Sequence, residues 1–332
     1  MRLENVLALT NGTVINEPFV KIFENIVFEA NKVKRGDLFI AFDESTIESA
    51  VLNGAYGVLF DKPTQINDFE IAWIKVDSIN EALKRLLRFK LIDKEITVYE
   101  CNEIVLKLAL QVMSEENFIA LHGDIKSIMK TLWDLPNKCT VLFSPALTPK
   151  EIFTDIKSIT SGSREPINII EQTLFETSFI YDNVFYERQL ISPFFMPYLE
   201  ELLHLFKTLK INFRIRKFTA IDHFEPVFTN KNFEIKEFGT SDKVLIFEST
   251  AELIDSEIAF LRKQANWAKI IFILPLQKSA NYAEYQDVHL YKYKKEIRNI
   301  LKNNSFHFAL IVGVDKSILT KPLPYLIQPT LF

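Results

Sequence analysis

The chain is poor in glycine, with 8 glycines among its 332 residues. At the average usage of roughly 7%, a chain of this length would hold about 23. Loops that wrap phosphate groups depend on glycine, because the backbone must approach the ligand closely and adopt positive φ angles. The shortage leaves few places where a phosphate-binding loop can form.

Cysteine and histidine are also scarce. The two cysteines, Cys101 and Cys139, predict no disulfide framework and suit a reducing cytoplasm. The five histidines are isolated from one another, and no His-x-x-x-His or Cys-x-x-Cys pair is present. We therefore expect no metal site. The sequence also lacks a Gly-x-Ser-x-Gly motif, which leaves a serine hydrolase without a nucleophile.

The charge balance and the apolar runs exclude two further classes. The formal net charge is −4, so no basic field indicates nucleic-acid binding. The longest apolar runs fall well short of the roughly 20 residues that a membrane helix needs, and the first residues show no signal-peptide pattern. We expect a cytoplasmic protein with no membrane partner and no direct contact with nucleic acid. Hydrophobic residues make up 48% of the chain, enough for two or three cores.

The first predicted domain covers residues 1–92. Gly36-Asp37 predicts a turn into a buried strand over 38–42, followed by a helix over 45–52 that ends at Asn53-Gly54. A second strand is expected at 57–60. A helix over 78–89 closes the domain, with its apolar residues on one face: Ile79, Ala82, Leu83, Leu86 and Leu87.

Two more predicted domains follow, at 93–224 and 225–332. In the first of them we expect strands at 96–99, 118–121 and 140–143, helices at 102–113, 124–135, 149–159 and 194–209, and a hairpin of 167–180 with 184–191. In the last, strands at 243–248, 269–274 and 308–312 alternate with helices at 255–266 and 294–303. This alternation predicts a parallel sheet.

Several of these segments resemble the peptidoglycan Mur ligases, cytoplasmic bacterial enzymes that add amino acids to UDP-N-acetylmuramoyl peptides. The resemblance is to the D-Ala-D-Ala-adding type, and its residues are 33–42, 50–60, 76–88 and the stretch Glu248-Ser-Thr-Ala-Glu-Leu-Ile-Asp-Ser256. It implies an α/β fold with a small N-terminal domain, a reduced central domain and a C-terminal Rossmann-like domain with a parallel sheet.

The resemblance also locates the candidate nucleotide site. Mur ligases hold the ATP phosphates with a Thr-Gly-x-x-Gly-Lys-Thr-Thr loop, and residues 118–128 stand in its place. Gly123, Lys126 and Ser127 remain, but the second glycine is absent, the loop is one residue short and Asp124 would repel phosphate. One hypothesis is a relic phosphate site. The other is an ordinary strand-to-helix turn with a solvated lysine.

The substrate side of the resemblance is incomplete as well. Where the family has Asp-Ser-Arg to meet the uridine nucleotide, this chain has residues 29–31, Glu-Ala-Asn. Glu248 and Ser249 follow an expected parallel strand, which is where open α/β sheets place ligand-binding groups. They are candidates for the substrate cleft, and the alternative is that Glu248 is a solvated carboxylate at the end of a strand.

The end of the chain carries a separate signal. Gln328-Pro-Thr-Leu-Phe332 resembles the Gln-x-x-Leu-Phe peptide with which bacterial polymerases and repair proteins bind the DNA sliding clamp. Leu331 and Phe332 can fill an apolar groove while Gln328 makes a directional polar contact. The alternative is that this tail folds back on the protein's own surface.

These observations lead to one functional hypothesis and one main alternative, and a scaffold with neither activity is a third possibility. The first is a Mur-ligase-like protein related to the synthesis of peptidoglycan precursors, with weak or lost ATP-dependent amide ligase activity, a UDP-N-acetylmuramoyl peptide as partner, and Mg-ATP as cofactor only where ligase activity is retained. The sequence assigns no catalytic residue. The alternative is an interaction protein that binds the sliding clamp through its tail.

Overall fold

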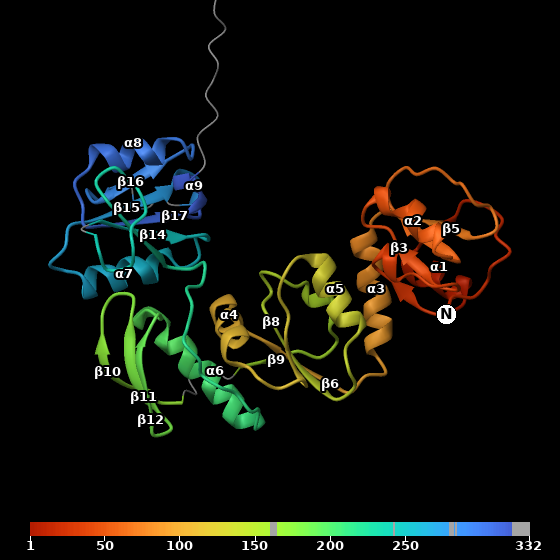
Figure 1. The fold of residues 1–332 in the computed structure, drawn as a ribbon, viewed down its shortest axis with the longest axis horizontal. Coiled ribbons are helices and arrows are strands. Elements are labelled where there is room, and N and C mark those ends of the chain that lie inside the picture. The colour runs from red at the N-terminus through yellow and green to blue at the C-terminus, as the bar shows by residue number, and fades with distance from the viewer. Residues whose placement is uncertain (160–164, 242, 279–281, 283, 321–332) are drawn as a thin grey trace, which may run out of the picture. The chain divides into compact units, whose positions relative to one another are not determined.

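The computed structural model describes residues 1–159, 165–241, 243–278, 282 and 284–320 (Figure 1). The chain forms two compact units. The first consists of residues 1–162 and 205–213, and the second of residues 163–204 and 214–332. The prediction of three domains with boundaries after residues 92 and 224 is a different division of the chain, and it stays a prediction.

The first sheet of the first unit has the strand order β1-β5-β4-β3-β2. Strand β1 is antiparallel to β5, and the other neighbours are parallel. The strands and the two helices of this part are β1 (Thr13–Val14), β2 (Ile26–Val27), β3 (Leu38–Ile40), β4 (Gly57–Phe60), β5 (Ala72–Lys75), α1 (Leu3–Thr10) and α2 (Ile47–Leu52). The strands β3 and β4 are buried throughout, as the sequence predicts for a sheet covered on both faces.

Helix α3 (Ile79–Leu91) lies between the two halves of this unit and packs against both α1 and α5 (Ile125–Trp133) (Figure 1). Its N-cap is Ser78, whose side chain accepts a hydrogen bond from the Glu81 backbone N–H. The five apolar residues predicted to form one face are all buried in a core that also contains Val98, Leu121 and Met129. The predicted amphipathic face is therefore confirmed.

The second sheet of the first unit has the order β7-β8-β6-β9, and all its pairs are parallel. Its elements are β6 (Ile96–Glu100), α4 (Glu103–Val112), β7 (Phe118–Ala120), α5, β8 (Cys139–Phe143) and β9 (Lys157–Ser158). Asn102 caps α4, at the start of the helix predicted over 102–113, and accepts a hydrogen bond of 2.7 Å from the Ile104 N–H.

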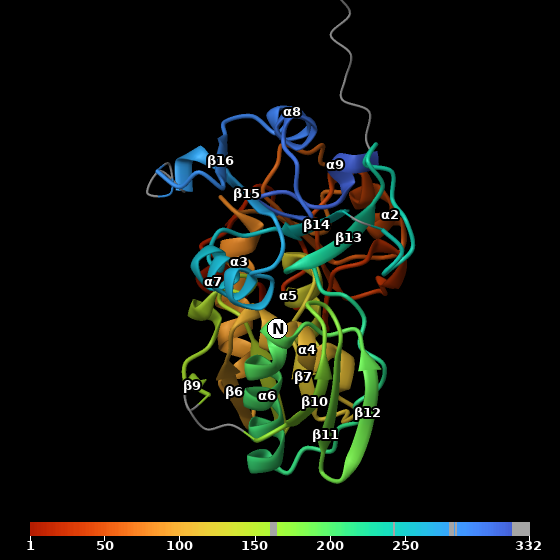
Figure 2. The same ribbon diagram turned by 90° about the vertical axis from the view of Figure 1, so that its left-hand side faces the viewer.

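The second unit begins with the antiparallel sheet β10-β11-β12, which Figure 2 shows as three strands side by side. The strands are β10 (Asn168–Gln172), β11 (Thr177–Tyr181) and β12 (Val184–Gln189). The turn between β11 and β12 contains Asp182 and Asn183, which both have positive φ, as the predicted hairpin requires. Helix α6 (Met196–Leu209) follows, and its residues are divided between the two units after His204.

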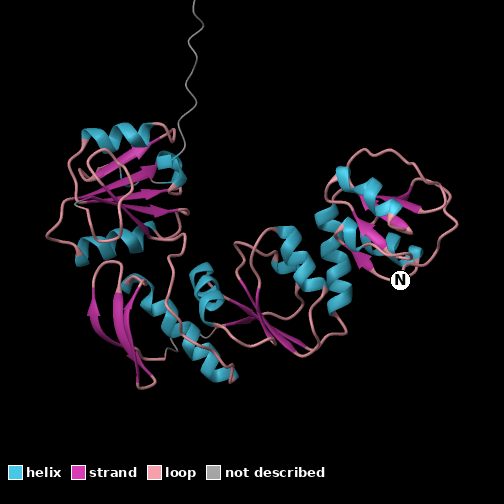
Figure 3. Cartoon of the chain, viewed as in Figure 1, coloured by secondary structure: helices cyan, strands magenta, loops and turns pink. Residues whose placement is uncertain are grey.

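The larger sheet of the second unit has the order β13-β14-β17-β15-β16. Strand β13 is antiparallel to β14, and the remaining pairs are parallel, as the alternation of strands and helices predicts. Helices α7 and α8 lie on opposite sides of this sheet (Figures 1 and 3). The elements are β13 (Glu225–Thr229), β14 (Lys243–Glu248), α7 (Ile254–Gln264), β15 (Ile270–Pro275), β16 (Val288–Tyr291), α8 (Glu296–Asn303), β17 (Phe308–Val312) and α9 (Ser317–Thr320).

Two predicted elements are wrong. The helix expected over 149–159 is a single 3-10 turn at Lys150–Ile152 followed by strand β9. Phe153 leaves the helical conformation and its ring packs 4.9 Å from that of Phe143, while β9 pairs with β6. The strand expected over 167–180 is two strands, because Thr173 accepts hydrogen bonds from the N–H groups of Phe175 and Glu176 and forms a turn.

Within the part of the chain that the structure describes, no helix is both long enough and apolar enough to cross a membrane.

Candidate functional site

The loop that stands in place of the ATP-binding loop lies between β7 and α5 in the first unit. Gly123 turns the chain with φ of +97°, a conformation that glycine adopts at no steric cost. Asp124 then caps α5, and its Oδ1 accepts a hydrogen bond of 2.8 Å from the Ser127 N–H. The hydrogen bonds from Ser127 lower the pKa of the Asp124 carboxyl. An internal carboxylate therefore occupies the position at the start of α5 where a phosphate would accept the same N–H.

Lys126 is the cation that this loop retains. Its Nζ lies 5.4 Å from the centre of the Phe42 ring, at the end of the first sheet. Its side chain is half-buried. The structure thus brings Gly123, Lys126 and Ser127 together in one turn, with the acid Asp124 in the middle of it.

Glu29 lies where the resemblance places the residues that meet a uridine nucleotide. Its carboxylate forms ion pairs with Lys130 and, at 2.9 Å, with Lys32. The hydrogen bonds from Lys130 and Lys32 lower the pKa of Glu29 to about 2. Glu29 is therefore ionised at neutral pH, and it occupies the two lysines that could otherwise bind an anion at this place.

Glu248 ends β14 in the second unit and is fully buried, so the prediction of a solvated carboxylate is wrong. His223 Nδ1 donates to it at 2.8 Å, the Thr250 N–H at 2.8 Å, the Thr250 hydroxyl at 3.0 Å and the Phe224 N–H at 3.2 Å. Burial alone would raise its pKa, but the hydrogen bonds from His223 and Thr250 outweigh burial and lower it. Glu248 is thus a buried, ionised acceptor.

Glu257, in the first turn of α7, is a second fully buried acid next to Glu248. Neither of its carboxyl oxygens has a hydrogen-bond partner of standard geometry among the described residues. Burial, and then the charge of Glu248, raise the pKa of Glu257 to about 10. Glu257 is therefore a neutral acid at pH 7 beside an ionised one.

This pair of carboxyl groups has the two protonation states that acid–base chemistry uses. Both side chains are fully buried, however, so in this conformation neither carboxyl is accessible to a substrate in solvent. Ser249, the other predicted cleft residue, is exposed, and its hydroxyl donates to the Asp222 carbonyl at 3.2 Å. Nothing in the sequence indicates that Glu248 meets His223 or Glu257, because neither spacing matches a known motif.

Two site predictions remain, the absence of a metal site and the C-terminal tail. Among the described residues, no group of three or more His, Cys, Asp or Glu side chains is arranged to hold a metal ion. The tail residues Gln328, Leu331 and Phe332 lie outside the described residues.

Comparisons with known proteins identify the fold. No protein-family profile and no curated protein sequence matches the chain. The structure search nevertheless returns Mur ligases, and the chain is an α/β protein with a Mur-ligase-like fold.

One similar solved structure is crystal structure I of MurF from Acinetobacter baumannii. The match covers 96% of this chain and 98% of that one, at a TM-score of 0.51 and 11% sequence identity. MurF ligase from Thermotoga maritima in complex with ADP also matches, over 89% and 95% of the two chains, at 11% identity and a TM-score of 0.47. At this level of identity the likeness extends to the fold alone.

Proposed function

We propose that this protein is a cytoplasmic, bacterial pseudoenzyme of the Mur-ligase type, which binds a UDP-N-acetylmuramoyl peptide and in which ATP-dependent amide ligation is weak or lost. The Mur-ligase-like fold supports the link to peptidoglycan precursors. The proposal assigns the protein a binding role in the synthesis of these precursors and leaves Mg-ATP as a cofactor only to the extent that ligation persists.

One observation carries the loss of ligation. The carboxylate of Asp124 accepts the hydrogen bond of the Ser127 N–H, at the start of the helix where ATP-binding loops place a phosphate. A phosphate in this loop would have to displace that carboxylate and approach its negative charge. Lys126 is the only lysine or arginine within residues 121–127 to offset it.

The chemistry of such a ligase needs ATP to activate a carboxyl group as an acyl phosphate. Without a phosphate site the bound peptide would meet no activated phosphoryl group, so binding would not lead to ligation. The buried pair of Glu248 and Glu257 does not replace this function, because neither carboxyl reaches solvent.

Thermal unfolding tests the proposal with two ligands, each at millimolar concentration. A ligand at about 100 times its dissociation constant stabilises the protein by about 2.7 kcal/mol, which corresponds to a shift of several degrees. We expect a shift with UDP-N-acetylmuramoyl tripeptide and none with Mg-ATP.

Each ligand tests a separate part of the proposal. A shift with Mg-ATP that is lost in Lys126→Ala, and kept in the exposed control Lys138→Ala, would show a working phosphate site and contradict the loss of ligation. If UDP-N-acetylmuramoyl tripeptide causes no shift, the proposed binding role is wrong.

The sequence Gln328-Pro-Thr-Leu-Phe332 supports a second candidate function, binding of the DNA sliding clamp. The segment contains Pro322, Pro324 and Pro329, and proline, whose φ is fixed, lowers the entropy cost of binding as an extended peptide. A synthetic peptide of residues 321–332 should bind a purified bacterial clamp, and the same peptide with alanine at positions 328, 331 and 332 should not. Equal binding of both peptides would exclude this mode of recognition.

A further inference from the structure

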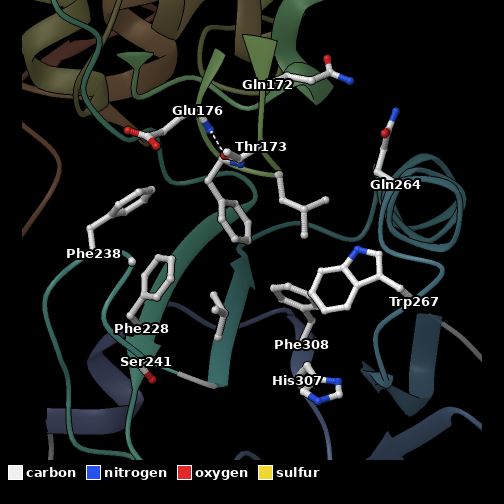
Figure 4. A pocket seen from close by; sticks show the side chains of 14 residues that line it. Gln172, Thr173, Glu176, Phe228, Phe238, Ser241, Gln264, Trp267, His307 and Phe308 are labelled. Carbon is white, nitrogen blue, oxygen red and sulfur yellow. Dashed lines mark hydrogen bonds between the residues drawn. The ribbon is translucent and has the colours of Figure 1, made fainter. Parts of the chain in front are cut away.

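A pocket of about 760 Å³ lies in the second unit, and none of the candidate site residues described above lines it. It is bounded by the turn between β10 and β11, the start of β14 and β17, and the end of α7 (Figure 4). Its volume is in the range of pockets that take small organic ligands, roughly 300–1,000 Å³.

Five aromatic side chains form a continuous arc along this pocket. The ring centres are 4.7 Å apart for Phe238 and Phe228, and 6.0 Å for Phe228 and Phe175. The arc continues from Phe175 to Phe308 at 6.2 Å and from Phe308 to Trp267 at 5.9 Å. Figure 4 shows Phe238 and Phe228 on one side of the pocket and Trp267 on the other.

The two ends of the arc are exposed, whereas its middle is buried. Trp267 is 72% and Phe238 43% exposed, but Phe175 and Phe308 are 7% and 8% exposed. Single exposed apolar residues are common, but two large rings at opposite ends of one apolar hollow are typical of a binding site.

The charge of the pocket selects among possible ligands. Among the described residues that line it, Glu176 is the one charged side chain, and none is Lys or Arg. Arg188 contacts the Glu176 carboxylate at 3.5 Å but does not line this pocket, and its own side chain is 72% exposed. A carboxylate beside several aromatic rings attracts cations, because the ring faces carry negative partial charge, and it repels phosphates and carboxylates.

A histidine that also hydrogen-bonds the backbone completes the lining. His307 Nδ1 accepts a hydrogen bond of 2.9 Å from the Lys269 N–H, so in the neutral ring the proton is on Nε2. The amides of Gln172 and Gln264 also reach the rim (Figure 4).

We propose that this pocket binds an organic cation with an aromatic or branched apolar body, such as a quaternary or substituted ammonium compound. The apolar body lies along the arc of rings, and the cationic group lies near Glu176. This site is independent of the proposed binding of a muramoyl peptide, which is an anion that the pocket disfavours.

Tryptophan fluorescence offers a direct measurement, because Trp73 and Trp133 are buried in the first unit and Trp267 is in the pocket. The probes are benzyltrimethylammonium, benzyl alcohol and phenylacetate, which share the phenyl group and differ in charge. We expect a saturable change with the cation, at least about fivefold tighter than with the neutral probe, and no saturable change with the anion. Trp267→Phe should abolish the fluorescence change.

Two matched variants test the role of charge. Glu176→Gln should weaken binding of the cation severalfold and leave binding of benzyl alcohol unchanged. Glu171→Gln removes a neighbouring exposed carboxylate that does not line the pocket, and it should leave both affinities unchanged. The proposal is overturned if no probe binds saturably to the folded wild type, if phenylacetate binds as tightly as the cation, or if Glu176→Gln has no effect.

Discussion

Glu248 and Glu257 are both buried, yet their pKa values are shifted in opposite directions. Glu248 accepts four hydrogen bonds from His223, Phe224 and Thr250, and the net result is a lowered pKa. Among the described residues Glu257 has no such donor, and burial, followed by the charge of Glu248, raises its pKa to about 10. Burial acts on both acids, and the donors that only Glu248 has keep that one ionised.

The raised pKa of Glu257 predicts that stability falls as pH rises. The ordinary value is 4.5 and the folded value is about 10, so the folded protein holds one proton more than the unfolded chain between these limits. Over this range Glu257 lowers the free energy of unfolding by about 1 kcal/mol for each pH unit. Urea unfolding of wild type and Glu257→Gln, compared between about pH 6 and pH 9, should show a flatter dependence in the variant.

The control for this comparison is Glu252→Gln, an exposed acid just before α7. It should keep the slope of the wild type. If Glu257→Gln and wild type have the same slope, Glu257 is ionised in the folded protein and the assignment is wrong.

His223 is predicted to stabilise the second unit through Glu248. His223→Ala removes a buried donor at 2.8 Å and leaves a cavity, which should lower the free energy of unfolding by about 3 kcal/mol. The exposed His122 serves as control, and His122→Ala should change the free energy of unfolding by less than about 0.5 kcal/mol. Equal denaturation midpoints for the two variants would contradict the role of His223.

The contacts of single side chains were the features least predictable from the sequence. The place of Glu248 after a strand makes it a candidate, but its hydrogen bond with His223 and its proximity to Glu257 arise only in the folded unit. A carboxylate at the end of a strand gives no local signal of the donors that will meet it.

The start of α5 illustrates what one element contributes. Asp124 caps the helix through the Ser127 N–H. Asp124→Ala should lower the urea midpoint, whereas Asp124→Asn should retain most of the stability, because asparagine also caps helices. An Asp124→Ala variant with the midpoint of the wild type would mean that the carboxylate does not occupy this position.

Strand β4 depends on a glycine for close packing. A Cβ atom at Gly57 would lie 2.6 Å from Cε1 of the buried Phe23, so one of them must move. Gly57→Ala should lower the free energy of unfolding by about 2 kcal/mol. Adding Phe23→Leu should recover part of this loss in a double-mutant cycle, and strictly additive losses would show that the two positions do not interact.

Elements with strong local signals were predictable. Strands β4, β14 and β17 have the expected bounds, and Asn102 and Asp124 begin α4 and α5 as their residue types suggest. The prediction of a helix over 149–159 was wrong because the pattern of apolar residues there also suits a turn followed by a strand. The pairing of β9 with β6 decided the outcome, and such pairing has no local signal.

For the whole molecule, the alternation of strands and helices was enough to predict the α/β class and the parallel sheets. The arc of aromatic rings was not predictable, because Phe175, Phe228 and Phe308 lie far apart in the sequence and meet only in the folded unit. The sequence therefore predicts the Mur-ligase-like fold better than it predicts the buried acid pair or the aromatic pocket.

The central claim is that the Mur-ligase-like fold persists while ATP-dependent ligation is weak or lost. Release of inorganic phosphate tests it most directly, with Mg-ATP, UDP-N-acetylmuramoyl tripeptide and D-Ala-D-Ala supplied together to the wild-type protein. We predict little or no release above that of a sample without protein, since Asp124 occupies the start of α5. Rapid release over many turnovers that requires all three substrates and disappears in Lys126→Ala would show an active ligase and contradict the claim.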